Sequence, residues 1–426
     1  MIANGPRLWS SRFDLRAPLL TTFRECVVKM RPDSRLAPLP GSGTAHSVRK
    51  DYNYTVHGFR GLAAVMVFVF HIFSSNVIPP LDFVPFWDNI HYLTDSLRYG
   101  VELFFMISGY VILSSLRRHA TIRQFLLDRC IRIYPAFLPI LFLIFIVGPI
   151  YGHGLIAVSV NGWQFFKGIT LTDYIGDFLA NFFFLPTVFP VPLAHWAAWS
   201  LSYEWVFYLL AGGSYFLFRH GISPRALIAV LVAVSVVLLN YYPRATFFIP
   251  GVLAFFCEDF IVARRRLFRF PLLALLALLV AWHETGVNDA AEPQLIEWAG
   301  DWRIFYFLIG IILGVYLIAA VIAGQGWLAR VLASPLLMFF GTVSYSFYLW
   351  HPIIMVAIRH LIVSRIIPTV GAYGAAGCFV VMSFAGSLVI AWASWRVLET
   401  WLARKVKQQL PALFLHRYVP RAAADR

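Results

Sequence analysis

Arg60 and His71 lie eleven residues apart in one apolar stretch, GFRGLAAVMVFVFHIF. At about 100° per residue, this spacing returns a helix to within roughly 20° of its starting direction, so both side chains share one face. The rise between them is about 16 Å, roughly half of a bilayer core. Ionisable groups inside a membrane mark functional sites, unless they only snorkel or bond to neighbouring helices. An imidazole held there can act as a general base toward a hydroxyl group.

Two glutamates and a second histidine are expected at a depth comparable to that of His71. Glu102 lies in YGVELFFMISGY, Glu204 in WSLSYEWVFY and His351 in SYSFYLWHP, each in the outer half of a different apolar span. A glutamate can orient an imidazole or hold an acceptor hydroxyl. The four side chains therefore predict one polar site in the outer half of the membrane, with His71, Glu204 and Glu102 as its catalytic candidates.

Aromatic residues flank these groups and are the candidate substrate contacts, together with His351. Trp199 can stack on a sugar ring, although tryptophans at this depth are often interfacial anchors. Tyr345 belongs to the same stretch as His351 but is expected nearer the inner side.

Arginines gather within about two helical turns of the opposite, cytosolic side. Arg60, Arg129, Arg132 and Arg123 all fall there. Guanidinium forks bind phosphate oxygens well, while loop arginines often only fix topology. A phosphate-binding site at one membrane face and a histidine near the other suit acyl transfer. The donor would carry phosphate groups and bind from inside, and the acceptor would be an alcohol that binds from outside. The same layout suits a proton-coupled transporter, so both classes stay open at this point.

The composition is that of a membrane protein. Hydrophobic residues make up 60% of the 426 residues and charged residues 13%, and mean hydropathy is +0.71. A soluble chain carries about twice that fraction of charge. The net charge of +14 sits between apolar spans, which indicates cytosolic loops and contact with anionic lipids rather than nucleic acid. The scattered cysteines and histidines predict no disulfide framework and no metal site.

The apolar runs predict an all-α, polytopic bundle of about ten transmembrane helices. The basic loops place the N- and C-termini in the cytosol. A shorter run, 178–188, is broken by prolines and is expected to be re-entrant or interfacial. The expected spans are 58–77, 99–116, 132–151, 199–218, 225–242, 244–262, 268–283, 303–323, 335–361 and 371–396.

The ends of the chain are expected to be cytosolic tails. Residues 1–50 are basic and rich in Pro, Gly and Ser, which predicts a disordered tail. They contain no apolar core of a cleavable signal peptide, and Met30 is an alternative start. Residues 51–400 form the membrane domain, and residues 401–426 form the C-terminal tail.

Five motifs, in order, resemble the acyltransferase 3 family of integral-membrane O-acyltransferases. They are HGFRGLAAVMVFVFH, YGVELFFMISGYVI, RCIRIYPAF, WSLSYEWVFY and GTVSYSFYLWHP. The resemblance runs from about Tyr54 to Glu399. Two positions depart from the family pattern: His57 stands where Asp is frequent, and Thr400 replaces the usual Pro.

The resemblance implies a bacterial inner-membrane enzyme that acetylates a sugar hydroxyl of a surface polysaccharide, lipopolysaccharide or glycoside. It implies acetyl-CoA or another acyl-CoA as co-substrate, with no tightly bound cofactor. Arg60, Arg132 and Arg129 would contact the CoA phosphates, and His71 would be the catalytic histidine, either as base or as transient acyl carrier. The expected partners are acyl-CoA, a glycan or lipid-linked sugar acceptor and membrane lipids. A transporter or flippase without acyl-transfer chemistry is the alternative.

Overall fold

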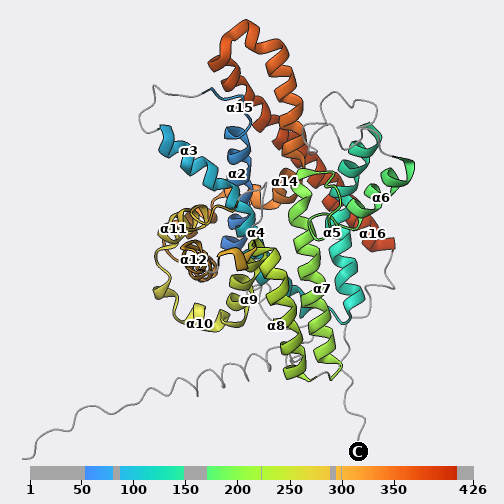
Figure 1. Ribbon diagram of the computed structural model, residues 1–426, viewed down its shortest axis with the longest axis vertical. Coiled ribbons are helices and arrows are strands. Elements are labelled where there is room, and N and C mark those ends of the chain that lie inside the picture. Colours follow the sequence, from blue (N-terminus) through green and yellow to red (C-terminus); the bar gives the residue numbers. More distant parts are fainter. Residues whose placement is uncertain are drawn as a thin grey trace, which may run out of the picture. The chain divides into compact units, whose positions relative to one another are not determined.

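The computed structural model describes residues 53–79, 87–147, 170–221, 223–287, 294–298 and 300–409. Both expected tails lie outside these residues, apart from the start of the C-terminal one. The regular elements of the described chain are all helices (Figure 1), which confirms the all-α prediction. They are α2 Tyr54–Phe73, α3 Trp87–Ser96, α4 Gly100–Leu116, α5 Ile122–Val147, α6 Leu171–Phe182, α7 Trp199–Arg219, α8 Pro224–Tyr241, α9 Phe248–Phe256, α10 Glu258–Ala263, α11 Pro271–His283, α12 Arg303–Ala323, α13 Gly326–Leu332, α14 Pro335–Leu361, α15 Ile367–Ser394 and α16 Ala403–Gln409.

Five helical stretches of the described chain are long and apolar enough to cross a membrane. The last of them joins α14, α15 and α16 through two π-helical segments. The predicted total of ten spans and the cytosolic position of both termini remain predictions. The five stretches are Tyr54–Phe73, Trp87–Leu116, Ile122–Ile146, Arg303–Ala323 and Pro335–Gln409.

The largest differences between predicted spans and observed helices lie in the third and sixth predicted spans. The third predicted span begins at Arg132, but α5 begins at Ile122 and holds Pro135 and Pro139 inside. Membrane helices tolerate internal proline where neighbouring groups satisfy the freed carbonyls. The span expected at 244–262 is divided between α9 and α10, which meet at Cys257. The run 178–188 holds the end of α6 and the turns that follow it.

Helix α2 carries Arg60 and His71 and is fixed at its start and along its length. Asn53 caps its N-terminus, where its side chain accepts hydrogen bonds from the backbone N–H groups of Thr55 and Val56. Its main neighbour is α14, and the two backbones nearly touch. A Cβ on Gly61 would lie 2.3 Å from the carbonyl oxygen of Leu337, which is on α14. Only small residues allow so close a crossing, so α2 and α14 hold a single register.

The family departure at His57 belongs to this same crossing. The Nε2 atom of His57 lies 3.1 Å from the hydroxyl of Thr342, and a Cβ on Gly341 would lie 2.3 Å from the His57 carbonyl oxygen. The imidazole therefore joins α2 to α14. A second close crossing joins α4 to α9, where a Cβ on Gly251 would lie 2.0 Å from the carbonyl oxygen of Met106.

Candidate functional site

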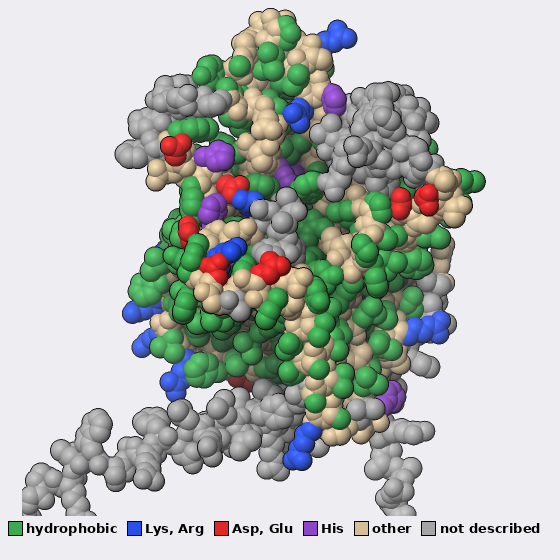
Figure 2. All heavy atoms as spheres, viewed as in Figure 1, with side chains coloured by type: hydrophobic (Ala, Val, Ile, Leu, Met, Phe, Trp, Pro, Cys, Tyr) green, Lys and Arg blue, Asp and Glu red, His purple; other side chains and the backbone are tan. Residues whose placement is uncertain are grey.

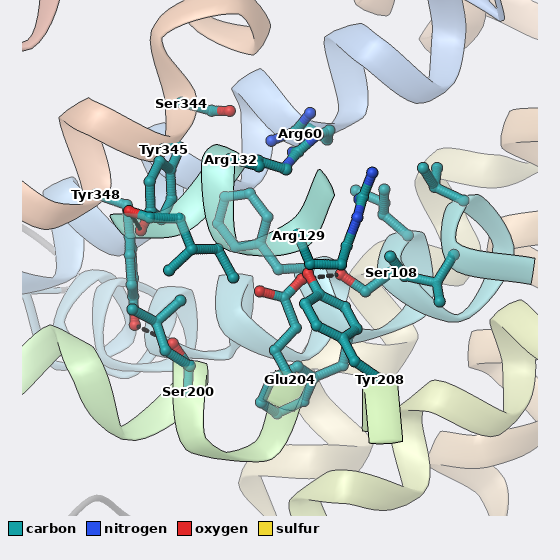
Figure 3. Close-up of a pocket in the computed structure, with 17 residues that line it drawn as sticks. Arg60, Ser108, Arg129, Arg132, Ser200, Glu204, Tyr208, Ser344, Tyr345 and Tyr348 are labelled. Carbon is teal, nitrogen blue, oxygen red and sulfur yellow. Dashed lines mark hydrogen bonds between the residues drawn. The ribbon is translucent and has the colours of Figure 1, made fainter. Parts of the chain in front are cut away.

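An inner cavity of about 750 Å³ lies between α2, α4, α5, α7 and α14. Figure 3 shows its arginines, tyrosines and serines converging on one space from these separate helices. Five residues proposed from the sequence line it: Arg60, Arg129, Arg132, Glu204 and Tyr345. The other polar lining residues are Ser108, Ser200, Tyr208, Ser344 and Tyr348.

The inner cavity carries an excess of positive charge. Its lining holds three arginines and one glutamate. Arg132 is exposed and lines this cavity. The carboxylate of Glu204 accepts a hydrogen bond of 2.6 Å from the Ser108 hydroxyl and lies within electrostatic reach of Arg60 and Arg132. Arginine forks that are not fully neutralised suit a ligand with several phosphate oxygens.

Arg129 is paired with a carboxylate that also binds the C-terminal helix α16. Its Nη2 lies 2.5 Å from Asp128, and Asp128 also binds the ammonium group of Lys407 on α16 at 2.6 Å. Arg129 is thus partly neutralised, which leaves Arg60 and Arg132 as the stronger anion-binding groups of the cavity.

A second, outer cavity of about 280 Å³ contains His71. Tyr348 lines both cavities, and its hydroxyl lies 3.0 Å from that of Ser200. The neighbouring residue, Trp199, belongs to the outer cavity while Ser200 belongs to the inner one. The two cavities therefore adjoin at Tyr348. The described residues that line the outer cavity are Val67, Phe70, His71, Arg98, Val101, Trp196, Ala197, Trp199 and Tyr348.

His351 packs against His71 rather than lining either cavity. The ring centroids of the two imidazoles lie 5.2 Å apart, and His351 is 1% exposed. The Nδ1 atom of His351 lies 3.0 Å from the carbonyl oxygen of Phe347, one turn earlier on α14. A carbonyl can only accept, so this contact assigns the proton of neutral His351 to Nδ1. His351 is thus placed to support the His71 ring and not to reach a ligand directly.

Glu102 also lies outside both linings. It forms a buried ion pair in which its Oε1 lies 2.6 Å from Nε of Arg244, with both side chains 2% exposed. The same oxygen accepts a hydrogen bond of 3.2 Å from the indole N–H of Trp282. The guanidinium of Arg244 lies 4.2 Å from the ring centroid of Trp199. Glu102 is therefore linked to the outer cavity through Arg244 and Trp199.

The nine residues proposed from the sequence fall into three groups. Glu204 was expected at the depth of His71, but it lines the inner cavity with the arginines, and His71 and Trp199 line the outer one. Glu102 and His351 stand behind the outer cavity. Sequence reasoning missed Arg98 and Arg244. The signal for both was a positive charge in loops that the charge pattern placed outside.

Comparison with known proteins covers most of the chain. The sequence model of a protein family, described as "Acyltransferase domain", matches residues 53–395 of this chain. The chain is 23% identical to the peptidoglycan O-acetyltransferase OatA of Listeria monocytogenes, over 82% of this chain and 56% of that protein. It is 27% identical to the exopolysaccharide production protein ExoZ of Rhizobium meliloti, over 59% of this chain and 74% of that protein.

A third relative is a putative O-acetyltransferase of Staphylococcus aureus, 24% identical over 69% of this chain and 49% of that protein. The chain thus spans about half the length of two of these three relatives. No solved structure matches the chain.

Proposed function

Because the chain belongs to the acyltransferase family whose domain matches residues 53–395, we propose that it is a membrane O-acyltransferase. The donor is an acyl-CoA, with acetyl as the acyl group. The acceptor is a sugar hydroxyl of a surface polysaccharide or glycoside, and the site of action is the bacterial plasma membrane. The proposal rests on one observation: a cavity lined by arginines and a cavity lined by His71 adjoin at Tyr348.

The donor would occupy the inner cavity with its phosphates on Arg60 and Arg132. The arm of coenzyme A is long and flexible, so its thioester can extend from these arginines past Tyr348. Arg60 and His71 are separated by about 16 Å along α2, and the arm of coenzyme A would span this distance. Glu204 would act at the donor end, where its carboxylate balances the two arginines before the phosphates enter.

The acceptor hydroxyl would meet the thioester in the outer cavity. His71 removes the hydroxyl proton as the oxygen attacks the carbonyl carbon. A carbon–oxygen bond forms, the carbon–sulfur bond breaks, and the leaving thiolate takes up a proton. The products are the sugar ester and free coenzyme A. His351 supports the imidazole of His71 from behind during this transfer.

Purified protein in lipid vesicles tests the proposal. Addition of acetyl-CoA and a glycan acceptor should release the thiol of coenzyme A and yield an acetylated glycan by mass spectrometry. A strain that lacks the protein should lose an acetyl group from a surface glycan. If no thiol is released with any acceptor, acyl transfer is contradicted, and the alternative function of a transporter is favoured.

The arginines give a prediction on the donor side. Arg60→Ala should raise the KM for acetyl-CoA about 10- to 100-fold, because a charge-assisted phosphate contact contributes roughly 1.5–3 kcal/mol. Arg60→Lys should recover only part of this, since an ammonium lacks the planar fork. The matched control is Arg123→Ala on the same helix as Arg132, outside both linings. Equal donor KM values in Arg60→Ala and wild type would remove Arg60 from the donor site.

The side of the membrane on which each cavity opens gives a second prediction. A single cysteine at Glu297, which is exposed, should react with an impermeant thiol reagent in intact spheroplasts, because basic loops stay inside and this acidic segment stays outside. A cysteine at Gln408 should react only after lysis. Cys26, Cys130, Cys257 and Cys378 are first replaced by serine. The reverse labelling would put the arginine cavity away from cytosolic acyl-CoA.

A further inference from the structure

The outer cavity contains one permanently charged side chain among its described lining residues, and that charge is compensated. The residue is Arg98, in the short 3₁₀ turn Leu97–Tyr99 that precedes α4. Its Nη2 forms an ion pair with the carboxylate of Asp95, and its Nε donates to the backbone carbonyl of Asp95 at 3.2 Å. The third nitrogen, Nη1, has no partner among the described residues.

Arg98 is held in place rather than left mobile. Its guanidinium lies 5.5 Å from the ring centroids of both Phe70 and Tyr99, and its side chain is 16% exposed. Asp95 is itself fixed, with one oxygen 3.6 Å from Nδ1 of His283 at the end of α11. A guanidinium clamped in this way loses little entropy when it binds a ligand.

The remaining described walls of the outer cavity are aromatic and aliphatic. The indoles of Trp196 and Trp199 face the same space as His71 and Arg98. Ligand cavities combine apolar and aromatic walls with a few placed polar groups, and the outer cavity has this composition. The apolar face of a pyranose packs on an indole, while its hydroxyls need donors and acceptors.

We propose that the outer cavity is the acceptor subsite and that Arg98, oriented by Asp95, selects an uncharged sugar unit. This inference rests on the proposed function. The free Nη1 edge of Arg98 donates to a sugar hydroxyl or ring oxygen, Trp196 supports the ring, and His71 receives the proton of the reacting hydroxyl. An acidic sugar is disfavoured because Asp95 already cancels the charge that would hold its carboxylate.

Two substitutions test the assignment from opposite directions. Arg98→Gln should raise the KM for a neutral acceptor, p-nitrophenyl β-glucoside or β-galactoside, by about 10- to 100-fold, the range for a hydrogen bond to a charged group. The KM for acetyl-CoA should change less than twofold. Asp95→Asn leaves the arginine charge uncompensated. It should lower the Ki of p-nitrophenyl glucuronide, measured against glucoside acetylation, about tenfold relative to wild type.

Arg303→Gln is the matched control, because Arg303 pairs with Asp301 in the same manner but lies outside both cavities. It should leave both the KM and the Ki unchanged. A neutral-acceptor KM in Arg98→Gln equal to that of wild type would overturn the assignment, as would a wild-type preference for glucuronide. Release of the coenzyme A thiol without acetylation of any glycoside would also overturn it. No thiol release at all would overturn the proposed function itself.

Discussion

His71→Ala should reduce acyl transfer by 100-fold or more while the protein still inserts into the membrane. General base catalysis contributes typically about 10²–10⁴-fold, and with alanine at position 71 none of the described residues that line the outer cavity is a base that can take the proton of the acceptor hydroxyl. The measurement is the rate of glycan acetylation by purified protein at saturating acetyl-CoA. Near-normal acetylation would assign His71 a structural role.

The control for this variant is His360→Ala, because His360 is an exposed histidine near the end of α14. It should keep the wild-type rate. A second measurement separates the two roles left open for His71. Incubation with acetyl-CoA alone, followed by acid quench and peptide mass spectrometry, should show no acetyl group on the peptide that contains His71. An acetylated His71 would make it an acyl carrier rather than a base.

Local pattern was sufficient to place some of the site. The spacing of Arg60 and His71 predicts a shared helix face, and the structure puts Arg60 on the inner cavity and His71 on the outer one. Both positions depend on a single helix, whose geometry follows from hydrophobic periodicity. This prediction needs no second element, so it does not depend on how the helices pack.

Depth along separate helices was harder to predict. Trp199 and Glu204 lie on the same helix, α7, yet Trp199 lines the outer cavity, and Glu204 lines the inner one, as the adjacent Ser200 already does. The sequence gives the order of residues on a helix but not its height in the bundle. That height depends on tertiary contacts, such as the close crossing of α2 with α14.

The role of Glu102 could not be read from its own helix at all. Its partner Arg244 is 142 residues away in the chain, on the segment before α9. A glutamate near the outer end of an apolar span has the pattern of a catalytic group, and also that of a buried counter-ion. Only the packing of α4 against α9, with Gly109 and Gly251 in contact, decides between these alternatives. We therefore treat Glu102 as a positioning residue that acts through Arg244.

Breaking the Glu102–Arg244 pair should be strongly destabilising. Arg244→Met leaves a buried carboxylate with the Trp282 N–H, and Glu102→Leu leaves a buried guanidinium against Trp199. Removing one partner of a buried pair typically costs about 3–5 kcal/mol. Each single variant should therefore show a large drop in melting temperature in detergent. Arg303→Met breaks a more exposed ion pair and should leave the melting temperature unchanged.

The double variant Glu102→Leu/Arg244→Met separates stability from positioning. A buried pair replaced by apolar side chains is often neutral in stability, so the melting temperature should return toward that of wild type. Acceptor binding should not return with it, because no cation then holds the Trp199 ring in the outer cavity. We expect the double variant to have a raised KM for the acceptor and an unchanged KM for acetyl-CoA. A double variant as unstable as either single would show that the pair is not the source of the loss. If both the melting temperature and the acceptor KM return to their wild-type values, Arg244 does not position Trp199. Glu102 then has a purely structural role.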